Sequence, residues 1–466
     1  MPQQELPCKN TVQFNGYYGC SLCYHPGKVH SGVIKYPIDV AEYSERNEEE
    51  MLADMLTATE EARSVRGVKG PTPLVNIPHF PVVWGFPPDF MHCCLLGVTR
   101  QLAELWFGSS SGEAFYIGSP TKIGLIDRRL VSIKPPSIVS RVPRPISERK
   151  YWKASEWYNW LLFFSLPCLL GVLPQPYLLH LSIFVRAMFL LLQKSISNED
   201  GNMADLLITS FVCKFQLLYG TPSMTFNVHS LTHLAKSVKK WGPLWTHSCF
   251  PFESCNGQIK KYLCGNKGIA LQAMHKFMLL KALPLYGHIY NVSERVTSHC
   301  NEMLGITSKF KGVEIDDVQL LGNPICVQLS DEERFALNFN GFIVDGNVES
   351  FCRLRKNGFT FHTYTYSRAT VRSDKYFCLL NGSCGELHRI ITHNGQCLIL
   401  YKEVLLGDAS EFDDQELGMS VGHIKRWMGT QENFQVRPAH HLSSSCVIVT
   451  LVNRSYVCFL PNHCVL

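Results

Sequence analysis

Apolar residues recur at helical spacing in the middle of the chain, from Ala154 to Leu283. This period places them on one face, which is the pattern of helices that bury one side. The predicted helices cover residues 154–173, 177–195, 203–219, 226–240 and 269–283, with a further helix that begins near Phe252. An acidic run from Asp39 to Arg63 is also helix-like, and we interpret it as a solvated face. Another helical period begins at about Asp89, after a proline-rich passage.

Beyond about Asn301 the apolar residues fall in short runs bounded by turn-forming residues, which is the pattern of strands. The predicted strands cover residues 351–355, 360–368, 376–380, 386–392, 397–401, 447–452 and 456–460. The segment His393-Asn394-Gly395-Gln396 predicts a tight hairpin, because Asn-Gly accepts the positive φ that such turns require. The C-terminal region is therefore predicted to be a small β barrel or curled sheet, with a few helical inserts such as His423–Met428.

The two changes of pattern predict an α+β protein that is mostly helical before its β-rich end. Four zones follow, with boundaries at residues 1–117, 118–153, 154–300 and 301–466. A chain of 466 residues is long enough for several domains. Its 46% hydrophobic and 18% charged residues exclude long disordered tails, because disordered chains are poor in apolar and rich in charged residues.

Two apolar stretches, Trp157 to Leu173 and Tyr177 to Leu192, raise the question of a membrane span. Prolines interrupt them, and both are shorter than the roughly 20 residues that a bilayer requires. We therefore predict two buried helices and no membrane partner. The 19 cysteines show no short repeating framework, and the N-terminus lacks the pattern of a secretory signal. This combination predicts reduced thiols in the nucleus or cytosol.

The second zone, 118–153, is strongly basic, with nine Lys and Arg residues against two acidic ones. Its five prolines predict an extended loop. Two interpretations stay open: a solvated linker, or a segment that contacts the phosphates of double-stranded DNA. Lys260 and Lys261 can likewise follow a DNA backbone or belong to a solvated helix face. The candidate DNA-binding residues are Arg128, Arg129, Arg141, Arg144, Lys150, Lys260 and Lys261.

Two pairs of metal-ligating residue types lie far apart in the sequence. Cys20 and Cys23 have the spacing that lets two thiolates reach one ion, and His229 and His233 would share one helix face. Joined in one zinc site, they would fasten the start of the chain to its helical region. Each pair alone is a weak motif, and core cysteines with packed histidines are the alternative.

Two acidic residues stand near the predicted starts of helices. Glu253 occurs in CFPFESCNGQIKKYL, and Asp89 occurs in PDFMH together with His92. A carboxylate at a helix N-terminus is commonly a favourable capping interaction. Two-metal nucleases require several carboxylates around ions about 4 Å apart. Glu253 can therefore be catalytic only if other carboxylates lie beside it.

Six ordered segments together resemble transposases of the CACTA (En/Spm-like) superfamily, in the form found in animal genomes. They are FNGYYGCSLCYHPG, VKGPTPL, PDFMHCCLLGV, KASEWYNWLLFFSLP, NVHSLTHL and GPLWTHSCFPFESCNGQIKK, and they span about Phe14 to Leu283. The C-terminal strands are similar to the tail that these proteins commonly carry. The resemblance implies a DDE/D transposase with a ribonuclease H-like core, a helical insertion and two divalent metal ions.

The resemblance assigns roles to particular residues. It implies that Cys20, Cys23, His229 and His233 bind a structural zinc ion and that Glu253 is the last catalytic acid. It further implies that 1–117 combines the zinc knuckle with part of the catalytic core, and that 154–300 holds the helical insertion and the closing core helix. Asp89 and His92 are candidate lining residues, which either face the catalytic site or support it.

The sequence departs from the family pattern where the second catalytic aspartate is expected, some ten to twenty residues before the cysteine pair. MPQQELPCKN contains no aspartate, and the first aspartate would lie before Met1. We therefore expect a transposase derivative that lacks transposition activity and retains DNA or partner binding in the nucleus. Two alternatives stay open: the C-terminal part of an active enzyme that uses Mg²⁺ or Mn²⁺, and an interaction protein without a DNA role. A homo-oligomer is a further expected partner.

Overall fold

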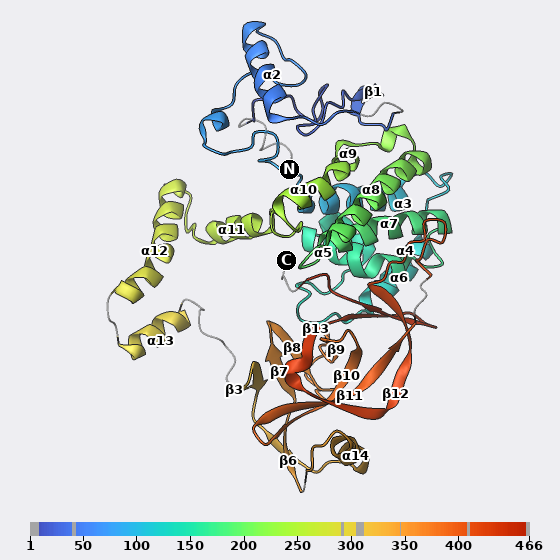
Figure 1. Ribbon diagram of the computed structural model, residues 1–466, viewed down its shortest axis with the longest axis vertical. Coiled ribbons are helices and arrows are strands. Elements are labelled where there is room, and N and C mark those ends of the chain that lie inside the picture. Colours follow the sequence, from blue (N-terminus) through green and yellow to red (C-terminus); the bar gives the residue numbers. More distant parts are fainter. Residues whose placement is uncertain are drawn as a thin grey trace.

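The structure is a computed structural model that describes residues 9–39, 43–289, 293–303, 312–344, 346–407 and 411–462. Helices make up 41% and sheets 21% of it, so the predicted α+β class is confirmed. Figure 1 shows an N-terminal segment (blue) above a helical body (green and cyan), a β-rich region (orange and red) below, and a helical arm (yellow) at the side.

The N-terminal segment contains one small hairpin and one helix. Strands β1 (Lys28–His30) and β2 (Val33–Lys35) pair antiparallel, and α2 spans Glu48–Glu60. The Asn47 side chain accepts a hydrogen bond from the Glu50 amide and so caps α2. The acidic run therefore forms the predicted helix. Its inner face is buried, however, with Asp54 only 3% exposed, so the run is not simply a solvated face.

The helical body follows the predicted helices closely. Its elements are η2 (Met91–Thr99), α3 (Arg100–Gly108), α4 (Pro120–Val131), α5 (Ala154–Asn159), η4 (Trp160–Phe164), α6 (Ser165–Leu169), α7 (Gln175–Leu191), α8 (Asn198–Tyr219), α9 (Phe226–Ser230), η6 (Leu231–His233) and α10 (Leu234–Trp241), with short turns η3 (Ile146–Tyr151) and η5 (Thr221–Ser223). The short turn η1 (Pro73–Asn76) precedes this body in the chain. Trp106, Trp157 and Trp160 are buried in its core. None of the described helices is both long and apolar enough to cross a bilayer.

Residues 118–153 are not the extended basic loop that the prolines predicted. Pro120 takes the first position of α4, where a missing N–H costs nothing, and Ile126 and Leu130 bury one face of that helix. The Arg129 guanidinium donates to the carbonyls of Cys168 and Leu170 at 2.7 and 2.8 Å. This part of the chain is therefore built into the helical body.

Two antiparallel sheets form most of the β-rich region. The larger pairs β13 (Leu442–Ser445), β9 (Tyr376–Leu379), β10 (Cys384–His393), β11 (Gln396–Leu406), β12 (Ile424–Pro438), β15 (Ser455–Cys458) and β14 (Val447–Thr450) in that order. In addition, β6 (Val348–Phe351) pairs with β10, and β5 (Ile325–Val327) pairs with β6. The smaller has the order β3 (Gly312–Ile315), β4 (Val318–Leu321), β7 (Arg353–Lys356) and β8 (Phe359–His362). The predicted hairpin is confirmed, with Asn394 and Gly395 both at positive φ between β10 and β11.

The larger sheet shares a core with the helical body. Phe412, Val447 and Tyr456 belong to the same buried cluster as the helices, and the His423 imidazole contacts the Leu162 carbonyl at 3.1 Å. Helix α14 (Asp331–Phe339) packs on β12. The C-terminal zone therefore contributes to the stability of the helical body and is not merely appended to it.

A helical arm connects the two regions in sequence. It comprises α11 (Phe250–Lys261), α12 (Ile269–Ile289) and α13 (Glu294–Met303), and it extends away from the helical body in Figure 1. No residue of α11 is buried. The arm carries Glu253 close to the body and exposes apolar side chains such as Leu271 and Met278 farther out.

One buried histidine makes the stability of the helical body depend on pH. The Nε2–H of His180 donates to the Phe211 carbonyl at 2.9 Å, and burial lowers the pKa of His180 to about 3. An unfolded histidine titrates at about 6.5, so the unfolded state binds the additional proton first as the pH falls. From pH 7 to pH 5 this residue is expected to cost about 2 kcal/mol of stability. Urea unfolding at both pH values should show that His180→Phe loses less unfolding free energy than wild type between pH 7 and pH 5. Equal losses in the two proteins would contradict this role of His180.

Candidate metal centre and adjoining pocket

Four buried side chains from two distant segments converge on one point. Cys20 Sγ lies 3.4 Å from His233 Nε2, and Cys23 Sγ lies 3.3 Å from His229 Nε2. The two Nε2 atoms are 3.4 Å apart, and all four ligand atoms lie within 4.8 Å of one another. These are the four residues that the sequence singled out, and together they can hold a metal ion such as zinc.

The loop before Cys20 fixes the position of the cysteine pair. At Gly19 a Cβ atom would overlap the backbone of Gln13 and the Tyr36 hydroxyl, so only glycine fits there. The amide of Leu22 points at Cys20 Sγ from 3.5 Å. The chain thus turns tightly around the two sulfur atoms, which is the geometry that their spacing predicted.

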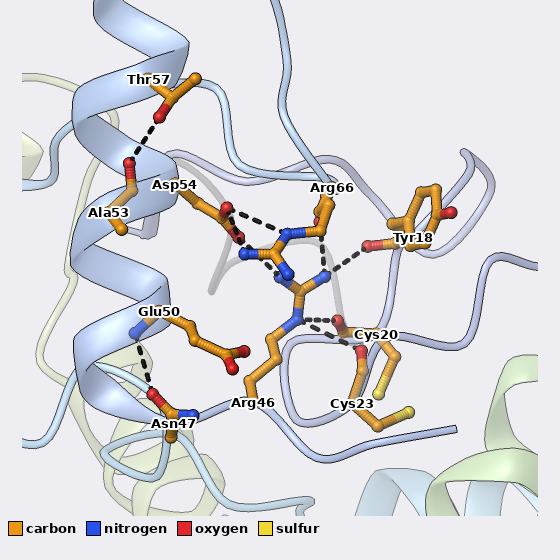
Figure 2. A network of polar contacts seen from close by, with 10 residues as sticks. All are labelled: Tyr18, Cys20, Cys23, Arg46, Asn47, Glu50, Ala53, Asp54, Thr57 and Arg66. Atoms are coloured by element: carbon orange, nitrogen blue, oxygen red, sulfur yellow. Dashed lines mark hydrogen bonds and ion pairs between the residues drawn. The ribbon is translucent and has the colours of Figure 1, made fainter. Parts of the chain in front are cut away.

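Arg46 supports the cysteine loop from the side opposite the sulfur atoms (Figure 2). Its Nε–H donates to the carbonyls of Cys20 and Cys23 at 3.0 and 3.2 Å, and its Nη2 donates to those of Tyr18 and Arg66 at 3.3 and 2.6 Å. One guanidinium therefore satisfies four backbone carbonyls, two of them belonging to the candidate ligands themselves.

Helix α2 anchors Arg46 through a carboxylate. Asp54 Oδ1 accepts two hydrogen bonds from Arg66 at 3.0 and 2.7 Å, and Asp54 Oδ2 faces Arg46 Nη1 at 3.9 Å. Both guanidinium groups also lie over the Tyr24 ring, 4.5 Å from its centroid. This network ties α2 to the cysteine loop, and Figure 2 shows Arg46, Asp54 and Arg66 together with the two cysteines.

Aromatic side chains orient the two histidines. Tyr36 stacks on His229 with ring centroids 5.2 Å apart, and its amide donates to the Met224 carbonyl at 2.9 Å. His25 packs edge-on against His229, but its own nitrogens are engaged: Nε2–H donates to the Pro37 carbonyl and Nδ1 accepts from the Gly27 amide. His25 is therefore a neutral supporting residue and not a ligand.

The two thiols differ in acidity. Burial opposes the ionisation of Cys20, but a hydrogen bond from Cys23 and the two histidines outweigh it and lower the pKa of Cys20 well below its ordinary value. The same hydrogen bond, together with burial, raises the pKa of Cys23. A cation bound there would replace the protons of the two thiols, because cysteine binds metals as the thiolate.

A cavity of about 710 Å³ adjoins the candidate metal centre. Its walls include Cys20 and His233 on one side, Asp89 and His92 on another, and residues of α11 on a third. Those on α11 are Phe252, Glu253, Asn256, Ile259 and Lys260. The structure therefore brings Asp89, His92, Glu253 and Lys260 to one pocket, whereas Lys261 does not line it.

Asp89 has a structural role at the wall of this cavity. Its Oδ2 accepts hydrogen bonds from the backbone and ring of His92 at 2.9 and 2.6 Å, and its Oδ1 accepts one from the Cys249 amide at 2.7 Å. Burial alone would raise the pKa of Asp89, but these hydrogen bonds lower it. Asp89 thereby joins the start of η2 to the start of α11 and fixes how Glu253 approaches the cavity.

Asp89 and Glu253 are the acidic residues that line the cavity within the described parts of the chain. Glu253 is in the first turn of α11, as predicted, and its side chain is exposed. Asp89, His92 and Cys249 form a second group of close ligand atoms, half-buried at the cavity wall. The described residues do not bring three carboxylates together there.

The predicted DNA-binding residues of 118–153 fall into two groups. Arg144 is engaged with Glu156 at 2.7 and 2.9 Å, and Arg129 caps carbonyls in the body, so neither is free for phosphate. Arg128, Arg141 and Lys150 are exposed. The sequence did not distinguish these groups, because the partners of Arg129 and Arg144 come from residues that only folding brings near.

In comparisons with known proteins, no protein-family model, no curated protein and no solved structure matches this chain.

Four residues that support the candidate ligands are not marked by any sequence motif, namely His25, Tyr36, Arg46 and Asp54. Tyr36 and His25 lie close to the cysteine pair in sequence, but neither type is diagnostic of a supporting role. Arg46 follows Glu45 and precedes three consecutive glutamates, which looks like an ordinary solvated charge pattern.

Proposed function

We propose that Cys20, Cys23, His229 and His233 bind one structural zinc ion. In a tetrahedral zinc site with bonds of about 2.0 to 2.3 Å, neighbouring ligand atoms lie about 3.3 to 3.8 Å apart. The observed separations of 3.3 and 3.4 Å fit this range. Two thiolates and two imidazoles form a closed set, so the ion would fasten the N-terminal segment to the helical body.

We further propose that the chain is a CACTA-type, transposase-derived protein with a partly ribonuclease H-like core, and that it binds double-stranded DNA. The observation that carries this proposal is the convergence of the two ligand pairs, 206 and 213 residues apart. The resemblance implies that convergence, together with an acid about twenty residues after the second histidine. Glu253 occupies that position and lines the cavity beside His233.

In this proposal the protein binds DNA but does not cleave it. A two-metal site requires several carboxylates free to coordinate ions. The cavity offers Glu253 and Asp89, and Asp89 is committed to three hydrogen bonds. The arrangement of Glu253, Lys260 and Asp89 around one cavity favours a second candidate, the C-terminal part of an active Mg²⁺- or Mn²⁺-dependent transposase. A DNA-nicking assay with either ion separates the two: nicking that Glu253→Gln abolishes would support the second.

The DNA-binding proposal predicts a strong dependence on salt. Reversing the charges of Arg128, Arg141 and Lys150 to glutamate is expected to weaken DNA binding and to lower the slope of log K against log salt by about three, since each phosphate contact contributes about 0.9. Fluorescence anisotropy with duplex DNA at several salt concentrations measures both.

A control outside the basic segment reverses two cations, Lys28 and Arg63, which are exposed but already paired with Asp39 and Glu61 at 2.7 Å. This control should bind DNA like wild type. Wild-type binding that is absent or independent of salt would favour an interaction protein without a DNA role.

We include nuclear localisation in the same proposal, because a protein that binds DNA must reach it in the nucleus. A homo-oligomer stays a prediction, to be tested by light scattering of the purified chain.

A further inference from the structure

Three buried cysteines of the β-rich region lie far from the candidate zinc centre in sequence and belong to neither the cavity nor the basic segment. Cys378 is in β9, Cys384 begins β10, and Cys446 follows β13. Their sulfur atoms all lie within 4.8 Å of one another, and their exposed fractions are 5%, 1% and 2%. The proposed function makes no use of them.

The sheet itself holds these sulfurs together. Cys378 and Cys384 are directly opposite each other in the β9–β10 pairing, and Ser444 of β13 is opposite Cys378 on its other side. A tight turn joins β9 to β10, in which the Leu379 amide donates to the Ser383 carbonyl at 2.9 Å and Gly382 has φ of +84°. The cluster is thus fixed by backbone pairing on both sides of β9.

The spacing of the sulfurs fits ligands of one ion. Cys378 Sγ and Cys384 Sγ are 3.3 Å apart, well beyond the roughly 2.05 Å of a disulfide bond. Three sulfurs bound to one ion at about 2.3 Å would lie about 3.8 to 4.0 Å apart. In the structure one sulfur–sulfur distance is 3.3 Å and none exceeds 4.8 Å, so the expected distance lies between these two values. Isolated core cysteines have no need to converge in this way.

The surroundings select the kind of ion. Apolar side chains pack against the cluster, among them Val404, Val457 and Trp427, and no carboxylate or imidazole joins the group in the described parts of the chain. Thiolates without oxygen ligands favour soft cations over Mg²⁺, Ca²⁺ or Mn²⁺. Lys425 acts electrostatically on Cys384, and its positive charge with that of a divalent ion would balance three thiolates.

We propose that Cys378, Cys384 and Cys446 form a second metal site, a three-thiolate site for a soft divalent cation of the Zn²⁺ type. It is separate from the Cys20 centre and stabilises the junction of β13, β9 and β10. The ion has three protein ligands here, so its fourth position is left for water or an external ligand.

The test is the metal content of the full-length protein, purified with a thiol reductant and measured by mass spectrometry of the native protein and by elemental analysis. Two ions per chain are expected in wild type. Cys446→Ala should hold one ion, and Cys20→Ala should also hold one. The control Cys397→Ala removes an equally buried cysteine of β11 outside the cluster and should keep two. Circular dichroism checks that each variant is folded.

Two results would overturn the proposal. A single ion per wild-type chain that Cys20→Ala removes entirely would show that the second site does not bind metal. A wild-type mass lower by two hydrogens, with Cys378 and Cys384 found linked after digestion, would assign the pair to a disulfide instead. Cd²⁺ added to the purified protein probes the ion class: a new thiolate charge-transfer band that Cys446→Ala lacks supports a soft-cation site.

Discussion

Replacing His233 with alanine is expected to release the zinc ion from the Cys20–Cys23–His229–His233 centre and to lower the stability of the protein by several kcal/mol. The binding free energy of a structural zinc ion, about 10 kcal/mol or more, is folding free energy, because the site is not preformed in the unfolded chain. Here the ion would join segments 213 residues apart, so its loss would release the N-terminal segment from the helical body. Zinc content and thermal unfolding measure the two effects.

Cys20→Ser should behave like His233→Ala, because it removes a ligand from the opposite segment. The matched control is Cys213→Ser, which changes an exposed thiol of α8 and should alter neither the zinc content nor the melting temperature. Unchanged melting temperatures in both ligand variants would remove the zinc assignment. Chelation of wild type should reproduce the effect of the substitutions, with lower pH favouring loss of the ion because protons compete for the thiolates.

Arg46→Met should cost about 3 to 5 kcal/mol, although Arg46 contacts no metal in the proposal. Methionine keeps the apolar stem but removes the guanidinium that serves four carbonyls and faces Asp54 Oδ2. Those buried acceptors would lose their donors, and the carboxylate would keep only Arg66 as a partner. Urea unfolding measures the loss. Zinc binding by the folded variant should also weaken, since the carbonyls of Cys20 and Cys23 would no longer be held.

The control for this prediction is Arg63→Met. The Arg63 side chain is 71% exposed and its guanidinium pairs with Glu61 at 2.7 Å, so removal of that group should change stability by less than about 1 kcal/mol. Equal effects of the two substitutions would mean that the network in Figure 2 does not support the cysteine loop.

Several features could be predicted from the sequence because they depend on local periodicity or on residue type. The helical period predicted α7, α8 and α12 to within a few residues at most ends, and Asn394-Gly395 predicted the β10–β11 turn. The prediction for 118–153 was wrong, because proline excludes helix interiors but not first turns, and Pro120 begins α4. The predicted helical insert His423–Met428 was also wrong, because Ile424 begins strand β12, whose exposed and half-buried residues give no clear apolar alternation.

For the candidate site, the sequence by itself determined the ligand types and their spacing within each pair, because CxxC and HxxxH are local patterns. It also placed Glu253 at the start of a helix. Only the tertiary structure decided that the pairs meet, that Asp89 is used as a hydrogen-bond acceptor, and that Arg129 and Arg144 are engaged while Arg128 and Arg141 are exposed. The physical reason is that burial, pairing and shared ions join residues distant in sequence, and local patterns do not report which distant residues those will be.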